Sequence, residues 1–262
     1  MKKLILWLGL LALTFQATAA EMSAGEIIER SQRAFYYPGD DMKARVIMQL
    51  IDRDGRVRSR MMSMLRRDAA EGGNQKYFIY FHEPGDVRRM TFMVWKDPVE
   101  EDLRWIFIPA VDLVRRIAAD DKRSSFVGSD FTYEDISGRD LAADAHALVR
   151  EELLDGQDTY VIQSTPKEVV EYTKRISWID KRTFLPLREE YYDAQEALFR
   201  VFTADRVEDI AGWPTATRRT MTSVKTGHRT EVSFEAVTYD LGLEDEDFIE
   251  RRMRRPLRAW ID

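Results

Sequence analysis

The chain has 262 residues, no cysteine and a formal net charge of −6, with acidic and basic residues interspersed. The acidic balance argues against nucleic acid as a partner. The absence of cysteine excludes disulfides, thiol chemistry and cysteine-ligated metals. A chain of this length can bury a hydrophobic core without such cross-links, either as one large β domain or as two smaller ones.

The first twenty residues have the pattern of a secretory signal peptide. Lys2 and Lys3 precede an apolar run over residues 4–15, which ends in small residues up to Ala20. An apolar helix of about 18 Å is too short for a hydrocarbon core of ~30 Å, so the pattern favours a cleaved leader over a membrane anchor. We therefore expect a leader over residues 1–20, one domain over residues 21–262 and a periplasmic location. Without a cysteine at the cleavage point, we expect no lipid anchor.

Residues 23–36 predict one amphipathic helix, in which Ser23 and Glu26 have the spacing of a capping box. After a turn, residues 42–50 alternate between apolar and polar side chains, which is the period of a strand with one buried face. Residues 56–67 predict the returning strand.

The rest of the chain predicts short strands between explicit turns such as Asp155-Gly156 and Thr226-Gly227. Tight turns join antiparallel neighbours, so we expect a meandering antiparallel sheet. Further helical signals are sparse and lie near residues 129–136 and 245–252. The additional strands are expected at residues 75–82, 89–96, 103–108, 111–117, 146–154, 158–165, 171–180, 185–193, 197–208, 214–225 and 228–240.

Two of these strands are apolar on both faces, over residues 77–81 and 105–108. A sheet with one solvated face would alternate, so helices or a curled sheet must cover both faces. Methionine is concentrated in the same half of the chain, and its adaptable side chain suits a cavity for flexible chains as well as an ordinary core. Composition leaves both alternatives open.

Several motifs occur in an order that resembles a known family. Residues 126–135, with the sequence FVGSDFTYED, are the most specific, and Tyr172-Thr-Lys174, Trp178-Ile-Asp180 and Gly212-Trp-Pro214 follow. Together they resemble the outer-membrane lipoprotein-sorting proteins, a periplasmic group similar to the carrier LolA, over essentially the whole mature chain. One departure is that residues 87–91 read VRRMT, without the glycine–threonine pair with which this strand usually opens in the family.

The resemblance implies a mainly β (α+β) fold, in which a single strongly curved antiparallel sheet forms an incomplete barrel, covered by a few short helices, around an apolar cavity. It implies a monomeric periplasmic carrier that binds the acyl chains of a lipoprotein or another lipid. The carrier would shuttle this cargo from an inner-membrane exporter of the resistance-nodulation-division type toward the outer membrane, with transient membrane contact and neither a cofactor nor a catalytic step. A regulator of the same fold, sensing lipid or peptide in envelope-stress signalling, is the alternative.

The candidate ligand-facing residues are the apolar side chains of the first strands and the central aromatic residues. A shift of one residue in register exchanges the two faces of a strand, so the sequence does not decide which parity faces inward. The candidates are Met42, Val46, Met48, Leu50, Phe78, Tyr80, Phe92, Val94, Trp105 and Phe107.

Two basic clusters are candidates for contact with lipid headgroups or with an acidic docking surface, although such clusters are commonly solvated faces. They are Arg115, Arg116, Lys122 and Arg123, and the later Arg251, Arg252, Arg254 and Arg255.

A catalytic site has little support. The three histidines, at positions 82, 146 and 228, do not have metal-ligand spacing. Asp130, Glu134 and Asp135 offer paired carboxylates for a hydrolase, but acidic residues at a helix start also serve as caps. We expect Ser129 and Asp130 to cap a short helix here, which Phe131 and Tyr133 pack onto the sheet.

Overall fold

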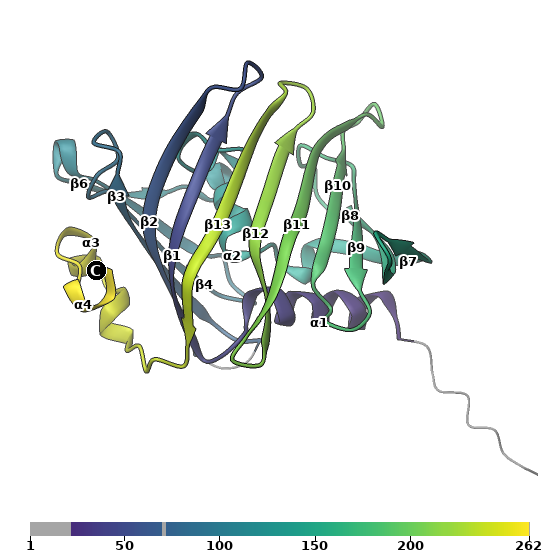
Figure 1. Ribbon diagram of the computed structural model, residues 1–262, viewed down its shortest axis with the longest axis horizontal. Helices are drawn as coiled ribbons and strands as arrows, with labels where there is room; N and C mark the ends of the chain where they lie inside the picture. Colours follow the sequence, from purple (N-terminus) through teal and green to yellow (C-terminus); the bar gives the residue numbers. More distant parts are fainter. Residues whose placement is uncertain (1–21, 70–71, 262) are drawn as a thin grey trace, which may run out of the picture.

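A computed structural model describes residues 22–69 and 72–261 and shows one antiparallel sheet of thirteen strands with a few short helices (Figure 1). The expected leader, residues 1–20, lies outside the described residues. Within the described ranges, no helix has the length and apolar character required to cross a membrane.

All thirteen expected strands are present close to their predicted positions. The alternating and doubly apolar segments therefore identified strands correctly. The strands are β1 (Asp41–Ile51), β2 (Val57–Asp68), β3 (Gln75–Glu83), β4 (Thr91–Lys96), β5 (Leu103–Ile108), β6 (Leu113–Ile117), β7 (Asp144–Leu154), β8 (Gln157–Pro166), β9 (Lys174–Asp180), β10 (Pro186–Tyr192), β11 (Leu198–Ile210), β12 (Trp213–Ser223) and β13 (His228–Tyr239).

The sheet consists of two meanders joined at its centre. Strands β1 to β6 pair with their sequence neighbours, and so do strands β7 to β13. The first and last strands, β1 and β13, pair with each other, with Met42 opposite Tyr239 and Ile51 opposite Arg229. Strands β6 and β7 are the two edges, so the sheet is curved but not closed. The incomplete barrel is confirmed, whereas simple up-and-down order does not account for the central β1–β13 pair.

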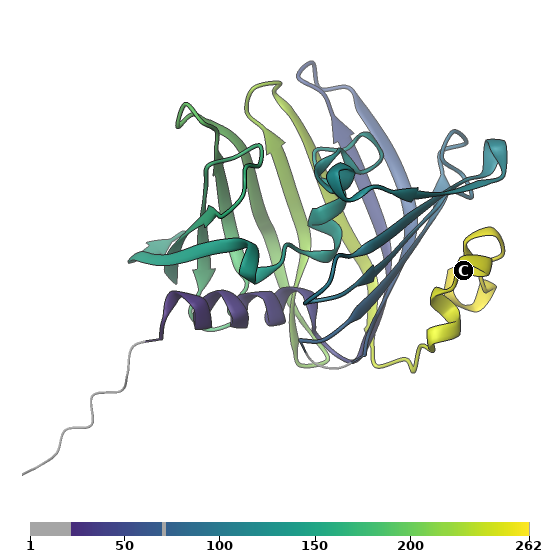
Figure 2. The same ribbon diagram turned by 180° about the vertical axis from the view of Figure 1, so that it is seen from behind.

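The helical elements lie on both faces of the sheet. Helix α1 (Ala24–Tyr36) begins at the predicted capping box and crosses the inner face near β7, β8 and β12 (Figure 2). The connection from β6 to β7, which we call the crossover (residues 118–143), also lies against the inner face. The crossover contains η2 (Ala119–Arg123), η3 (Phe126–Gly128), α2 (Tyr133–Ser137) and η4 (Leu141–Ala143), and a further short turn, η1 (Pro109–Val111), precedes β6.

The cap of α2 differs from the prediction. Thr132, not Ser129 or Asp130, is its N-cap, and the Thr132 hydroxyl and the Asp135 carboxylate form a reciprocal capping box. The Asp130 carboxylate instead accepts a hydrogen bond of 2.7 Å from the Thr230 hydroxyl on β13. Because Asp135 lies three residues after Thr132, these two residues cap the helix together. Asp130 is not needed as a cap, and its side chain attaches the crossover to the sheet instead.

One apolar cluster occupies the inner face of β1 to β5, and another occupies the outer face of β2 to β5. The inner cluster joins these strands to the crossover and to β11–β13. The outer cluster lies beneath the C-terminal segment, residues 241–261. That segment contains η5 (Asp245–Phe248), α3 (Glu250–Arg254) and α4 (Arg258–Ile261), so the predicted helix at 245–252 is a series of shorter turns. The doubly apolar strands are therefore covered on both faces, as expected.

Candidate functional site

Six of the ten candidate ligand-facing residues lie together on the inner wall of the sheet. Each is at least nine-tenths buried, and the rings of the crossover fill the space against them. Phe92 lies 5.2 Å from Phe126 and 5.3 Å from Tyr133, measured between ring centroids. The inner wall is therefore closed by the protein's own aromatic side chains. The six residues are Met42, Val46, Met48, Leu50, Phe92 and Val94.

The other four candidates, Phe78, Tyr80, Trp105 and Phe107, lie on the outer face. They belong to the cluster around Phe248 and Met253 of the C-terminal segment. Successive side chains of a strand point to opposite faces. The parity chosen on β4 faces inward, whereas the parity chosen on β3 and β5 faces outward. The structure thus divides the predicted set by strand parity.

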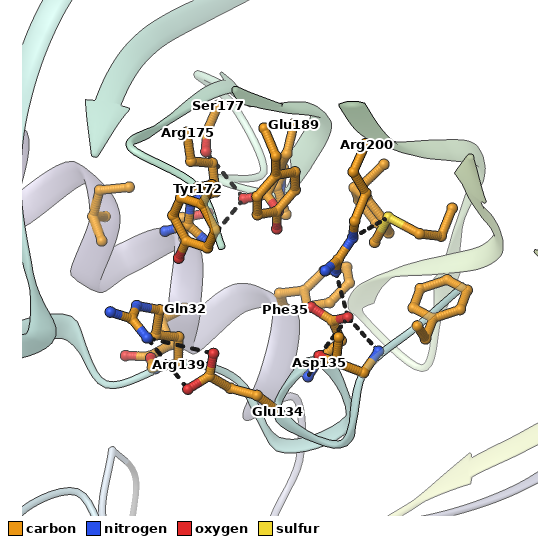
Figure 3. A pocket seen from close by; sticks show the side chains of 18 of the residues that line it. Gln32, Phe35, Glu134, Asp135, Arg139, Tyr172, Arg175, Ser177, Glu189 and Arg200 are labelled. Carbon is orange, nitrogen blue, oxygen red and sulfur yellow. Dashed lines mark hydrogen bonds and ion pairs between the residues drawn. The ribbon is translucent and has the colours of Figure 1, made fainter. Parts of the chain in front are cut away.

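A cavity of about 110 Å³ lies on the inner side of β9 to β12, between that half of the sheet, α1 and the crossover (Figure 3). Ligand pockets for drug-sized molecules usually span roughly 300–1,000 Å³. A larger ligand would fit this cavity only if α1 or the crossover moved away from the sheet. Helix α1 is attached to the crossover by hydrogen bonds from Gln32 to the Arg139 carbonyl, at 3.0 Å, and from the Tyr36 hydroxyl to the Asp135 carbonyl, at 3.4 Å.

The crossover is attached to β11 through Asp135. Its carboxylate pairs with the guanidinium of Arg200 (Figure 3). Arg200 is only 8 % exposed; its guanidinium stacks 4.6 Å above the Tyr191 ring, and its Nε donates to the Met221 sulfur at 3.0 Å. Buried guanidinium groups need such partners because desolvation disfavours an isolated charge.

Three further ion pairs lie around the same cavity. Glu134 of α2 lies 3.4 Å from Arg139, which also pairs with Asp144 at 2.9 Å. Burial raises the pKa of Glu134, and the neighbouring Arg139 opposes that rise. On the sheet, Arg175 lies 3.5 Å from Glu189. The cavity is therefore lined by charged groups as well as rings, in contrast to the apolar inner wall.

Arg219 of β12 differs from these arginines. Its guanidinium lies between the rings of Phe35 and Phe234, 4.2 Å and 4.3 Å from their centroids, and its Nε donates to the Ala216 carbonyl at 2.9 Å. Within the described residues, no carboxylate forms an ion pair with it. Burial lowers the pKa of Arg219 to about 10, so the group is protonated at neutral pH.

The first predicted basic cluster is divided between β6 and the crossover. Arg115 and Arg116 are exposed on the edge strand β6. Lys122 and Arg123 instead approach carboxylates at the cavity, with 4.0 Å from Lys122 to Glu134 and 3.1 Å from Arg123 to the carboxylate of residue 171.

The second basic cluster belongs to the C-terminal segment on the outer face. Arg251, Arg254 and Arg255 are exposed and Arg252 is partly buried. The Arg254 side chain pairs with Asp112 at 3.3 Å and so ties the segment to the turn before β6.

Two of the three histidines bond to serines of the neighbouring strand, His82 to Ser63 and His146 to Ser164, each at 2.9 Å. In the part of the chain that the structure describes, no group of three or more histidine and carboxylate side chains is placed to hold a metal ion.

Sequence reasoning missed the arginines of the cavity, namely Arg139, Arg175, Arg200 and Arg219. Their partners lie far away in the sequence: Arg200 is 65 positions from Asp135. Charge alternation within one strand gives no sign of such pairs. The nearest signal is the motif Tyr172-Thr-Lys174, which immediately precedes Arg175.

Comparison with known proteins identifies the family. A family model described as an uncharacterized protein matches residues 73–255, and the chain belongs to that family. The chain is 29 % identical to a DUF1329 family protein from Desulfovibrio piger, with a TM-score of 0.79 over 88 % of this chain and 98 % of the other. A search of curated proteins finds no match.

Two other solved structures share this fold. A protein from Vibrio parahaemolyticus, described as an outer membrane lipoprotein-sorting protein domain, is 28 % identical, with a TM-score of 0.82 over 88 % of this chain and 98 % of the other. A LolA superfamily protein from Nitrosomonas europaea is 20 % identical, with a TM-score of 0.68 over 88 % of this chain and 99 % of the other. The expected resemblance to the lipoprotein-sorting, LolA-like group is thus confirmed.

Proposed function

We propose that the protein is a periplasmic carrier that binds the acyl chains of a lipoprotein or another lipid against the inner wall of its sheet. The observation that carries this proposal is the apolar inner wall, formed by β1 to β5 and covered by the crossover instead of by a second sheet. The fold shared with lipoprotein-sorting proteins supports the same class of function. The carrier would take its cargo from an inner-membrane exporter of the resistance-nodulation-division type and release it toward the outer membrane.

The proposed mechanism is reversible shielding by a lid formed from α1 and the crossover. In the closed state, Phe126 and Tyr133 cover the inner wall, and the Asp135–Arg200 pair attaches the crossover to the sheet. Acyl chains replace these rings when the lid opens. Each buried methylene contributes about 0.8 kcal/mol, and the cost of opening the lid offsets part of that affinity, which allows an acceptor that binds better to remove the cargo. No covalent step or cofactor is required.

Arg115 and Arg116 are the candidate contacts to a partner or to lipid headgroups in this proposal. Both project from the exposed edge strand β6, next to the start of the crossover. An acidic surface that binds this edge would act directly beside the lid. Contact with the membrane would be transient, and the carrier would work as a monomer.

The test is to purify the protein from a periplasm and to identify bound molecules by native mass spectrometry and lipid extraction. A fluorescent fatty-acyl probe is then titrated into the delipidated protein. We expect co-purified lipid and saturable probe binding, and Phe92→Asp, which places a charge on the inner wall, should abolish probe binding. Phe199→Asp on the partly exposed position of β11 is the matched control. A protein that carries no lipid and does not bind the probe would refute the proposal.

A further inference from the structure

Arg219 lies where a charged cavity meets an apolar one. It lines the cavity between α1, the crossover and β9 to β12, and it also lines a second cavity of about 40 Å³. The second cavity continues toward β1 and β2 and is lined mainly by apolar side chains, which include Met42, Met64 and Val237; its other arginine, Arg66, pairs with Asp68. An extended molecule passing from one cavity to the other would place its polar end next to Arg219 and its apolar end on the inner wall.

Among the arginines that line the first cavity, Arg219 is the one without a carboxylate partner within the described residues. The cavity's four carboxylates each have a cation: Asp135 has Arg200, Glu134 has Arg139, Glu189 has Arg175 and Glu171 has Arg123. The guanidinium of Arg219 has only aromatic rings and one backbone carbonyl as partners among the described residues.

A second cationic group at the same cavity has unused hydrogen-bonding capacity. The Nε of Arg175 is buried and has no hydrogen-bond partner within the described part of the chain. Guanidinium groups match oxyanions with paired, charge-assisted hydrogen bonds, and an aromatic sandwich fixes the plane of the fork. An oxyanion entering this cavity would give Arg219 the anionic partner that it lacks among the described residues, and the Nε of Arg175 could donate a further hydrogen bond to it.

We propose that Arg219 binds the oxyanion headgroup, a carboxylate or a phosphate, of an amphiphile whose apolar tail lies along the inner wall. This inference rests on the proposed carrier function and adds a chemical selection to it. Uncharged lipids of equal tail length would be bound less tightly because they leave the partly buried guanidinium of Arg219 without an anion. The lid helix takes part, since Phe35 of α1 forms one side of the Arg219 sandwich.

The test compares a fluorescent polyene fatty acid with its methyl ester, titrated into the delipidated full chain at pH 8. The variants are Arg219→Gln and Arg219→Lys. The matched control is Arg218→Gln, the adjacent and exposed arginine of the same strand. We expect wild type to bind the acid at least tenfold more tightly than the ester, as one charge-assisted hydrogen-bonded pair provides. Arg219→Gln should lose this preference, Arg219→Lys should keep part of it, and Arg218→Gln should keep all of it.

The outcomes separate the two proposals. Failure of wild type to bind either probe refutes the carrier function itself. Equal affinity of wild type for acid and ester overturns the headgroup site and leaves the carrier function in place; this comparison needs no variant to fold. Equal weakening of both probes by Arg219→Gln means that Arg219 only supports packing, which also overturns the site. Displacement of the acid by millimolar inorganic phosphate alone would assign the site to free anions and not to an amphiphile.

Discussion

The carboxylate of Asp135 has two roles: it closes the capping box of α2 and pairs with Arg200 of β11. Replacing Asp135 with Asn keeps much of the cap but leaves a buried guanidinium without its anion. We expect the free energy of unfolding to fall by about 3 kcal/mol, because breaking one side of a buried ion pair strands the other charge. Denaturant unfolding measures this change.

The control for the Asp135 variant is Thr132→Ala, which removes the hydroxyl of the cap and leaves the ion pair. It should cost about 1 kcal/mol. Equal losses in the two variants would show that the pair with Arg200 contributes nothing beyond the cap.

Asp68 at the end of β2 predicts a pH dependence of stability. Its carboxylate pairs with Arg66 at 3.1 Å and accepts a hydrogen bond from Gln75 at 2.8 Å. Burial raises the pKa of Asp68 to about 6, although Arg66 opposes the rise. A carboxyl whose pKa is higher in the folded state than in the unfolded state stabilises the fold below its unfolded pKa. That contribution is lost as the pH rises through the folded pKa.

We therefore expect wild type to lose about 1–3 kcal/mol relative to Asp68→Asn as the pH increases from 4 to 7. Urea unfolding of both proteins at several pH values measures the difference. A constant difference across this range would show that Asp68 has an ordinary pKa in the folded protein.

At the level of elements, the contact between α1 and the crossover depends on Gly138. This residue follows α2 with a φ of +83°, and an added Cβ would lie 2.9 Å from the ring of Tyr36 on α1. Gly138→Ala therefore combines backbone strain with a clash at the lid. Gly156→Ala is the matched control, because Gly156 has a φ of +84° with no neighbouring atom within 4 Å of its added Cβ.

We expect Gly138→Ala to be about 1–3 kcal/mol less stable than Gly156→Ala, because overpacking adds to the shared backbone strain. It should also take up an acyl probe faster in stopped-flow measurements, since the clash opens the lid. Identical uptake by the two variants would argue against α1 as part of the lid.

Strand positions and the first helix were predictable because their signals are local. The Ser23–Glu26 spacing, the alternation of residues 42–50 and the turn dipeptides each act within a few residues of the chain. The cap of α2 was predicted at the wrong residue, since Ser129, Asp130 and Thr132 are all good caps and only the surrounding contacts choose among them.

The candidate site was predictable only in part. Which face of each strand points inward, and which charged residues pair, depend on contacts between residues that are far apart in the sequence. Residues 77–81 are apolar on both faces, so their sequence gives no difference between the inner wall and the surface under the C-terminal segment. Likewise, the pairing of Arg200 with Asp135 follows from the way the crossover lies on the sheet, and not from either sequence neighbourhood.

At the scale of the whole molecule, the proposed function requires the lid to move relative to the sheet. The chain has no cysteine, so two introduced cysteines can carry spin labels without background. Labels at Glu29 on α1 and Glu235 on β13 report the separation of lid and sheet, and labels at Arg218 and Glu235 report the sheet alone. We expect an acyl probe to lengthen or broaden the first distance distribution and to leave the second unchanged. An unchanged first distribution at saturating probe would contradict lid opening.

The central pairing of β1 with β13 has a consequence for how the chain folds. Its partners, such as Met42 and Tyr239, lie at opposite ends of the sequence, and pairings of such long range form slowly. During synthesis, the meander β1 to β6 is complete long before β13 exists, and β1 then presents an unpaired strand edge. Open edges recruit strands from other chains. Truncated or stalled chains that lack β13 should therefore be the aggregating forms of this protein, and the last strand made is the one that protects the first.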